Sequence, residues 1–145
     1  MEFTHNYKII EDASLPLMLD QYHLICQLNT KLEFLEYQEM LTDMHTQNYH
    51  MLCVFDEHKC VGVSGYRIAT KIYCGKYLEL DNVVVEEAYR NTGIGKIMCD
   101  KLNAIAIKHA CKVLMLDAYL SNLPAHLFYE REGFEKKGYH FLKRL

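Results

Sequence analysis

Apolar residues in the first third of the chain follow two kinds of spacing, one typical of a strand and one typical of helices. A short apolar stretch, 7–11, predicts a strand. Ser14 and Pro16 then signal a helix start, and the spacing of the apolar residues that follow predicts a first helix over 15–28. Within 33–46, apolar residues recur every three or four positions with polar residues between them. This spacing predicts a second amphipathic helix, whose apolar stripe is most simply explained by burial in a core.

The middle of the chain has the pattern of β-hairpins. Apolar runs at 50–55 and 60–68 flank the polar segment 56–59, which predicts two strands joined by a turn. A second turn at 74–76 leads into another strand-like run, 77–85. These segments together predict consecutive antiparallel strands.

The last third returns to alternating helices and strands. A long amphipathic segment begins at Ile94, and the nearly continuous apolar run 113–116 predicts a central strand that is buried on both faces. Asn122 is placed to cap a short helix, and 139–142 predicts a last strand. The chain contains no internal repeat, linker or low-complexity tract, so we expect one α/β domain over residues 1–145.

Composition and charge narrow the range of functions. Half of the 145 residues are apolar, which fits one domain with a substantial core, and the formal net charge is -3. The lysines and arginines are scattered along the chain, so we expect no nucleic-acid partner. The N-terminus has no basic segment followed by an apolar one, and no apolar run is long enough to span a membrane. We therefore expect no membrane partner and a cytoplasmic location.

Cysteine and histidine usage gives no indication of a disulfide or a metal site. The six cysteines lack C-x-x-C spacing and lie mostly in apolar segments, so we expect reduced thiols and no structural disulfide. The eight histidines are dispersed, without an H-E-x-x-H pattern or a His/Cys pair at ligand spacing. We expect no bound metal.

The segment Arg90–Lys96 carries the clearest chemical signal. It contains two glycines between a strand-like run and a helix start, where free backbone amides and the helix dipole favour a phosphate group. A P-loop would need serine or threonine where Ile97 stands, and a dinucleotide fingerprint would need a small residue where Met98 stands. The segment therefore favours a pyrophosphate-bearing cofactor bound by another kind of loop.

Two motifs carry a resemblance to a known family. Arg90-x-x-Gly93-x-Gly95 is similar to the R/Q-x-x-G-x-G/A signature of the GNAT superfamily of acyl-CoA-dependent N-acyltransferases. Downstream, 122–134 resembles the family segment N-x-x-A-x-x-h-Y-x-x-x-G-F, in which h is apolar. Glu87 stands where many members carry proline. The clear match covers roughly residues 78–145.

The resemblance implies a fold and a co-substrate. It implies a central mixed, splayed β-sheet flanked by about four helices, with acetyl-CoA in the cleft and no metal. The backbone amides of Val83, Val84 and Val85 would pair with the pantetheine arm of acetyl-CoA, and Asn122 would contact the same arm. The pyrophosphate would lie against Arg90, Asn91, Thr92, Gly93, Ile94, Gly95 and Lys96. Related enzymes often form dimers, and 140–145 is a candidate edge for a homodimer.

Acetyl transfer to nitrogen needs a proton acceptor and a proton donor. Tyr129 stands at the position of the family's tyrosine, where a phenol can donate to the CoA sulfur. Glu79 is the first candidate for the base because some family members place a glutamate eleven residues before the loop arginine. Asp81 and a water chain remain alternatives, and Glu79 and Asp81 share one strand face unless a bulge intervenes.

The acceptor is the least determined part of the hypothesis. We expect a primary amine of a small molecule or peptide, bound against the first two helices. Tyr22, Glu33, Glu36 and Tyr37 are candidates for an acidic, aromatic pocket that would suit a cationic amine. The main alternative is a non-catalytic acyl-CoA-binding or regulatory module, and a phosphate binder that does not use CoA is a third possibility.

Overall fold

The computed structural model describes residues 6–145, in which five strands form one mixed sheet in the order β1-β2-β3-β4-β5. The first four strands pair antiparallel with their neighbours, and β5 pairs parallel with β4. The strands are β1 (Lys8–Ile10), β2 (Tyr49–Asp56), β3 (Lys59–Lys71), β4 (Gly75–Val85) and β5 (Val113–Met115). The two hairpins predicted from the sequence are therefore confirmed, each with longer strands than the apolar runs alone indicate.

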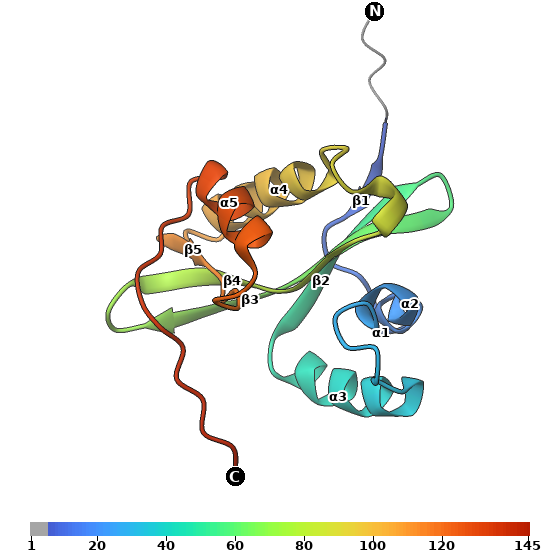
Figure 1. The fold of residues 1–145 in the computed structure, drawn as a ribbon, viewed down its shortest axis with the longest axis horizontal. Coiled ribbons are helices and arrows are strands. Elements are labelled where there is room, and N and C mark those ends of the chain that lie inside the picture. Colours follow the sequence, from blue (N-terminus) through green and yellow to red (C-terminus); the bar gives the residue numbers. More distant parts are fainter. Residues whose placement is uncertain (1–5) are drawn as a thin grey trace, which may run out of the picture.

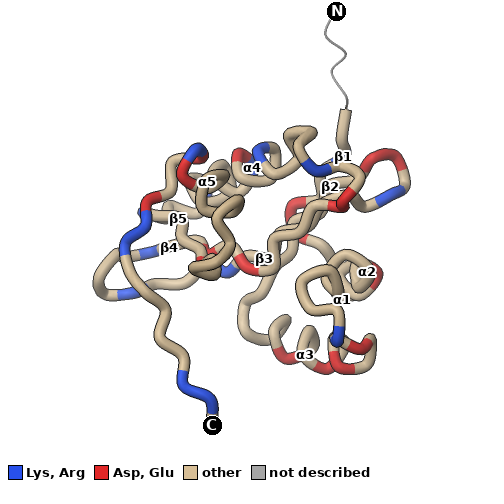
Figure 2. Tube along the Cα trace, in the orientation of Figure 1, with Lys and Arg blue, Asp and Glu red and all other residues tan. Residues whose placement is uncertain are grey.

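Helices cover both faces of the sheet. One face is covered by α1 (Leu15–Leu19), α2 (Tyr22–Ile25) and α3 (Phe34–Thr46), and the other by α4 (Ile94–Lys108) and α5 (Leu123–Arg131) (Figure 1). A short 3-10 helix, η1 (Glu87–Tyr89), connects β4 to the loop before α4. Basic residues are spread over the chain, whereas acidic residues gather along α3 (Figure 2). Within residues 6–145, no helix has the length and apolar character needed to cross a bilayer.

Each face of the sheet buries its own apolar cluster. On the α1–α3 face, Met18, Leu24 and Leu41 pack with Tyr49 and Met51 of β2. On the α4 face, the helix contributes its apolar stripe to a second cluster, which contains Leu52, Val54, Leu78, Leu80, Ile94, Met98 and Leu102. Apolar residues that alternate along β2 and β4 thus serve two cores, as expected for a sheet with helices on both sides.

A β-bulge in β4 changes which face its side chains meet. Val63 pairs with Val84 and Gly65 with Asp81, so β4 carries one more residue than β3 across this interval. Asn82 has φ 56°, a left-handed conformation that asparagine tolerates better than most residues. Before the bulge Leu80 packs on the α4 face, and after it Val84 packs on the opposite face.

The first predicted helix is wrong in one respect. The segment 15–28 forms two short helices instead of one, so five α-helices flank the sheet. The chain turns at Gln21, whose backbone amide bonds back to Met18 O at 3.1 Å and whose Nε2 donates to Leu17 O at 3.1 Å. Because Gln21 is drawn into the core at 3% exposure, its amide competes with helical continuation.

Two predictions about the C-terminal third are also wrong. The run 113–116 was predicted to be a central strand, but β5 lies at the edge of the sheet, with Val113 exposed. The predicted last strand, 139–142, is not formed, because no backbone hydrogen bond joins residues 135–145 to any other described residue. The two differences are related. β5 could be a central strand only if another strand, such as the predicted 139–142, paired with its outer edge, and that pairing is not formed.

Candidate active site

The loop before α4 presents free backbone amides. Asn91 and Gly93 both have positive φ, 62° and 92°, which turns the chain sharply into the helix. Gly93 is the N-cap and supplies no side chain, and the first helical bond runs from Ile97 N to Gly93 O at 3.0 Å. The amides of Ile94, Gly95 and Lys96 consequently have no acceptor within residues 6–145. Such a helix start is suited to binding an anion.

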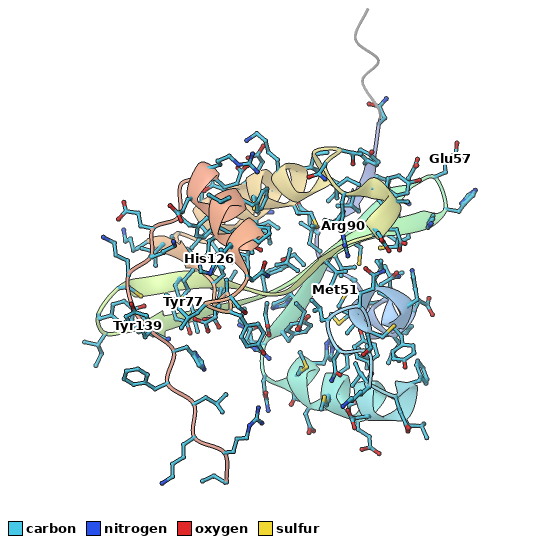
Figure 3. All side chains as sticks on the ribbon, in the orientation of Figure 1. Met51, Glu57, Tyr77, Arg90, His126 and Tyr139 are labelled. Carbon is cyan, nitrogen blue, oxygen red and sulfur yellow. The ribbon has the colours of Figure 1, made fainter. Side chains whose placement is uncertain are left out.

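Side chains hold the loop in this shape. Thr92 Oγ1 donates a short hydrogen bond to Tyr89 O. Arg90 donates from Nε to Val85 O and from its guanidinium to Gln27 Oε1, both at 3.3 Å. Gln27 Nε2 in turn lies 3.5 Å from Glu86 Oε2. Arg90 therefore connects the end of β4 to the segment after α2, and it lies between them in Figure 3.

Lys96 contributes a backbone amide to the loop, whereas the charge of its side chain is already paired. Its Nζ lies 3.4 Å from Asp100 and 3.4 Å from Glu132. The nearby Asp100 and Glu132 carboxylates raise the pKa of Lys96, so the side chain is cationic at neutral pH and already paired. Its backbone amide, in contrast, has no acceptor among the described residues.

The edge of β4 beside this loop has no strand partner in the described part of the chain. β5 pairs with β4 only at Tyr77, Leu78 and Glu79, whereas β4 continues to Val85. Val85 O accepts from Arg90 Nε, whereas the rest of the β5-side edge of 80–85, which includes Val83 and Val84, has no strand partner among the described residues and can bind an extended ligand that contains amide groups. This divergence of β4 from β5 is the splay that the resemblance implies.

Tyr129 lies against the same helix start. An added Cβ on Gly95 would lie 3.0 Å from Cζ of Phe128, so the glycine allows α5 to approach α4 closely. Phe128 and Phe134 pack edge-on against the Tyr129 ring at centroid distances of 5.1 and 5.5 Å. Burial, with a smaller contribution from Cys99, raises the pKa of Tyr129 to about 12. Its hydroxyl therefore keeps its proton at neutral pH, and it bonds to no other described residue.

Asn122 has the capping role that the sequence predicts. Its Oδ1 accepts a hydrogen bond from Ala125 N at 3.3 Å and closes the first turn of α5. The cap fixes where α5 begins and therefore where Tyr129 lies along it. The side chain is exposed, so its Nδ2 is accessible to a ligand.

Glu79 and Asp81 lie on one face of β4, because the bulge comes after both of them. Asp81 is paired with Arg67, whose Nη1 lies 3.1 Å from Oδ2, and Arg67 also stacks over the Tyr49 ring at 5.0 Å. Within residues 6–145, Glu79 forms no such ion pair. Partial burial, and then the charge of Asp117, raise the pKa of Glu79 above its usual range. Of the two carboxylates, Glu79 is the one available as a base.

The structure does not form the predicted aromatic acceptor pocket. Tyr37 is only 5% exposed, and its hydroxyl donates to Met18 O at 2.7 Å, so it belongs to the core. Tyr22 donates to Leu32 O and packs edge-on against Phe34. Both hydroxyls donate to backbone carbonyls and so help to hold the first helices together. Glu33 and Glu36 are simply exposed.

Three residues of the site were missed by sequence reasoning. Gln27 contacts Arg90, Phe128 positions Tyr129, and Asp117 acts on Glu79. Asp117 lies two residues after the end of β5, a region that often carries function in α/β sheets, and this position was a usable signal. Gln27 carried no local signal, since its contact with Arg90 joins residues 63 positions apart.

One cavity lies away from this site, and the described residues form no cluster suited to a metal ion. A cavity of about 500 Å³ lies between α1 and the β2–β3 turn, and no predicted site residue lines it. Among residues 6–145, no group of three or more His, Cys, Asp or Glu is arranged to hold a metal ion.

Comparison with known proteins shows a family match. The profile of the Acetyltransferase (GNAT) family matches residues 17–134. This range includes the glycine loop, the open edge of β4 and Tyr129. It also begins well before the region in which the sequence carries recognisable motifs.

Solved structures share the fold at low sequence identity. A putative acetyltransferase from Agrobacterium tumefaciens has a TM-score of 0.80 at 22% identity, covering 95% of this chain and 99% of that one. An aminoglycoside antibiotic 6′-N-acetyltransferase from Acinetobacter baumannii has a TM-score of 0.77 at 21% identity, covering 97% and 99%. Glucosamine-6-phosphate N-acetyltransferase from Arabidopsis thaliana has a TM-score of 0.74 at 20% identity, covering 96% and 98%.

Proposed function

The chain belongs to the GNAT acetyltransferase family, and from that premise we propose that it transfers the acetyl group of acetyl-CoA to a primary amine. The acceptor is a small molecule or peptide, and the amine attacks directly while both substrates are bound. The proposal rests on two neighbouring stretches of backbone that, among the described residues, lack hydrogen-bond acceptors or a strand partner. The free amides at the start of α4 lie next to the unpaired 80–85 edge of β4.

Those two surfaces fit the two chemical parts of acetyl-CoA. The amides of Ile94, Gly95 and Lys96 suit a pyrophosphate, and Gly93 leaves open space in front of them, since an added Cβ there would meet nothing within 4 Å. The backbone of Val83, Val84 and Val85 suits the amide-containing pantetheine arm. Arg90 holds the loop against Gln27, and Asn122 offers its exposed amide from the start of α5.

The chain's own side chains would manage the protons. Acetyl-CoA supplies an activated acetyl thioester. Glu79, whose pKa is raised, removes the proton from the acceptor amine, and Asp81 stays paired with Arg67. Tyr129 holds a proton at Oη, since its pKa is about 12, and can donate it to the leaving sulfur. The reaction needs one group that accepts a proton and one that donates a proton, and Glu79 and Tyr129 fit these two roles.

The charges beside Glu79 favour a cationic acceptor. Asp117 and Asp81 both act electrostatically on Glu79, against Lys71 and Arg67, so three carboxylates face two permanent cations here; Asp81 is paired with Arg67, and Asp117 lies 3.2 Å from His140. An ammonium group entering from this side meets a net negative field that also favours its delivery to the base. We therefore expect amines that are protonated in solution, such as polyamines, amino sugars or lysine side chains, to be better acceptors than neutral amines.

The first test of the proposal is ligand-dependent thermal unfolding. A ligand that binds only the folded state stabilises it by about 2.7 kcal/mol at a hundred times its Kd. We expect acetyl-CoA and CoA to raise Tm and ATP at the same concentration to have little effect.

Two glycine variants locate the binding site. Gly93 and Gly133 both have positive φ, 92° and 97°, and an added Cβ meets nothing at either position. Gly93→Val and Gly133→Val therefore carry a similar backbone strain, but only Gly93→Val should lose the Tm shift caused by acetyl-CoA. Equal shifts in the two variants would remove the loop from cofactor binding.

A further inference from the structure

The cavity of about 500 Å³ between α1 and the β2–β3 turn has the size of a small-molecule site. Three of its lining side chains are apolar. They are Leu17 of α1, Phe55 near the end of β2 and Cys60 near the start of β3. The cavity therefore offers an apolar surface on which part of a ligand can pack.

Two opposite charges line the same cavity without neutralising each other. Asp20 lies at the end of α1, and Lys59 is the first residue of β3. Within residues 6–145, neither of them forms an ion pair. A ligand that carries one cationic and one anionic group can satisfy both charges at once.

A buried hydrogen-bond acceptor lies next to Asp20. Gln21 lines the cavity and is 3% exposed, and its Nε2 donates to Leu17 O. Its Oε1 has no hydrogen-bond partner among the described residues. Because a buried oxygen without a donor costs free energy, an ammonium group beside Asp20 would be favoured twice, by the carboxylate and by this oxygen.

The side of the cavity formed by the turn favours a carboxylate. His58 lies on the turn next to Lys59, and His23 reaches the same cavity from α2. The lysine ammonium donates hydrogen bonds, and so does an imidazole N–H. An ammonium at one wall, a carboxylate at the other and an apolar surface between them match an α-amino acid with a large apolar side chain.

This cavity is separate from the proposed place of acetyl transfer. Glu79 pairs with Arg67, which lies seven residues along β3 from Cys60, or about 23 Å at the usual rise of a strand. In Figure 3, Glu57 marks the β2–β3 turn at one end of the sheet, and Tyr77 lies toward the other end. An amino acid bound in the cavity is therefore out of reach of Glu79.

Contacts connect the cavity to the glycine loop. Lys59 Nζ lies 5.8 Å from the centroid of the Tyr89 ring, a distance at which a cation is attracted to the ring. Tyr89 Oη donates to Asp56 Oδ2 at 2.6 Å, and Tyr89 O accepts from Thr92 of the loop. A ligand that fixes Lys59 and the turn consequently also restrains the loop.

We propose that the cavity binds a free amino acid with a large apolar side chain, and that this ligand strengthens the binding of acetyl-CoA at the glycine loop. The ammonium lies against Asp20 and Gln21, the carboxylate lies against Lys59 and His58, and the side chain packs on Phe55. The effect on acetyl-CoA rests on the proposed function, whereas the amino-acid site does not. By linkage, acetyl-CoA strengthens amino-acid binding by the same factor.

An NMR titration of the full chain with L-phenylalanine and L-leucine tests the site. We expect saturable shifts at the residues that line the cavity. N-acetyl-L-phenylalanine lacks the ammonium and L-phenylalanine amide lacks the carboxylate, so each should bind at least about tenfold more weakly. The proposal is overturned if neither amino acid binds saturably, or if N-acetyl-L-phenylalanine binds as tightly as L-phenylalanine, because the cavity would then select anions.

Charge variants locate the site. Asp20→Asn and Lys59→Gln should each weaken L-phenylalanine binding at least about tenfold. Asp43→Asn and Lys31→Gln are the matched controls, because both residues are exposed and neither lines the cavity, and they should bind as the wild type does. Wild-type affinity in both Asp20→Asn and Lys59→Gln would show that the ligand binds elsewhere and would overturn the proposal.

The Kd of acetyl-CoA is then measured with and without saturating L-phenylalanine. We expect the amino acid to lower this Kd at least about fivefold. An unchanged Kd, with amino-acid binding intact, would overturn the proposed effect on the loop. If acetyl-CoA binds under neither condition, the proposed function and the coupling both fail, whereas the amino-acid site is decided by the NMR titration.

Discussion

Tyr129→Phe separates the chemistry of the site from the stability of the fold. The substitution removes one oxygen, and that hydroxyl bonds to no other residue of the described chain. The packing of the ring between Phe128 and Phe134 is retained. We therefore expect the free energy of unfolding to change by less than about 0.5 kcal/mol.

The effect on turnover should be large. A positioned general acid contributes about 10²–10⁴-fold, which corresponds to roughly 3–5 kcal/mol of activation free energy. Because the pKa of Tyr129 is about 12, the wild-type phenol is protonated from pH 6 to 9. The loss should therefore be nearly constant across that range. Acetyl-CoA affinity should change little, since the proposed contacts with the cofactor are mainly backbone contacts.

A second tyrosine provides the opposite control. Tyr37→Phe also removes one hydroxyl, but this one donates to Met18 O at 2.7 Å in a core position that is 5% exposed. Its loss removes one hydrogen bond of the core, although Met18 O still accepts from Gln21 N, and should cost about 0.5–1.5 kcal/mol of stability, while kcat of the folded enzyme is kept.

The assay for both variants combines thermal unfolding with steady-state release of free CoA thiol. The reasoning is refuted if Tyr129→Phe keeps wild-type kcat. It is also refuted if Tyr129→Phe loses as much stability as Tyr37→Phe, because the phenol would then have a structural role.

Two further changes test the base and the bulge. Glu79→Gln should lower kcat/KM and remove the rise of kcat/KM with pH. The rise is expected because Glu79 must lose its proton before it can act as a base, and it does so as pH increases through its raised pKa. An unchanged pH profile would favour Asp81 or a water chain. Gly65→Ala should lower stability by about 1–3 kcal/mol, because an added Cβ would lie 2.1 Å from the buried Tyr49 Oη. Gly138→Ala is the control and should be neutral, because its added Cβ meets nothing within 4 Å. Equal melting temperatures for the two glycine variants would contradict the packing described around Tyr49.

The sequence predicted those parts of the fold in which local pattern and tertiary packing agree. The two hairpins and α3 to α5 follow from hydrophobic period and turn residues, and Asn122 was correctly read as a cap. The break at Gln21 was not predictable, because apolar residues continue through it and only a buried amide stops the helix. The edge position of β5 was missed for a related reason, since a continuous apolar run shows that a strand is apolar on both faces but not which strand lies beside it.

The site divides in a similar way. The glycine loop and Tyr129 lie in motifs with fixed spacing, so the sequence could locate them. The resemblance already placed Glu79 ahead of Asp81, but the physical reason is visible only in the structure, where Arg67 from a neighbouring strand forms an ion pair with Asp81. The contact between Gln27 and Arg90 likewise exists only in three dimensions. Contacts of this kind carry no periodic signal in the sequence.

The most direct test of the central claim is amine-dependent consumption of acetyl-CoA. The purified chain is incubated with acetyl-CoA and a panel of polyamines, amino sugars, free amino acids and peptides, and both free CoA thiol and acetylated amine are measured. We expect at least one acceptor for which the two products form in equal amounts, with formation much reduced in Tyr129→Phe. Tight binding of acetyl-CoA without amine-dependent thiol release across the panel would contradict this expectation and would identify the chain as an acyl-CoA-binding module.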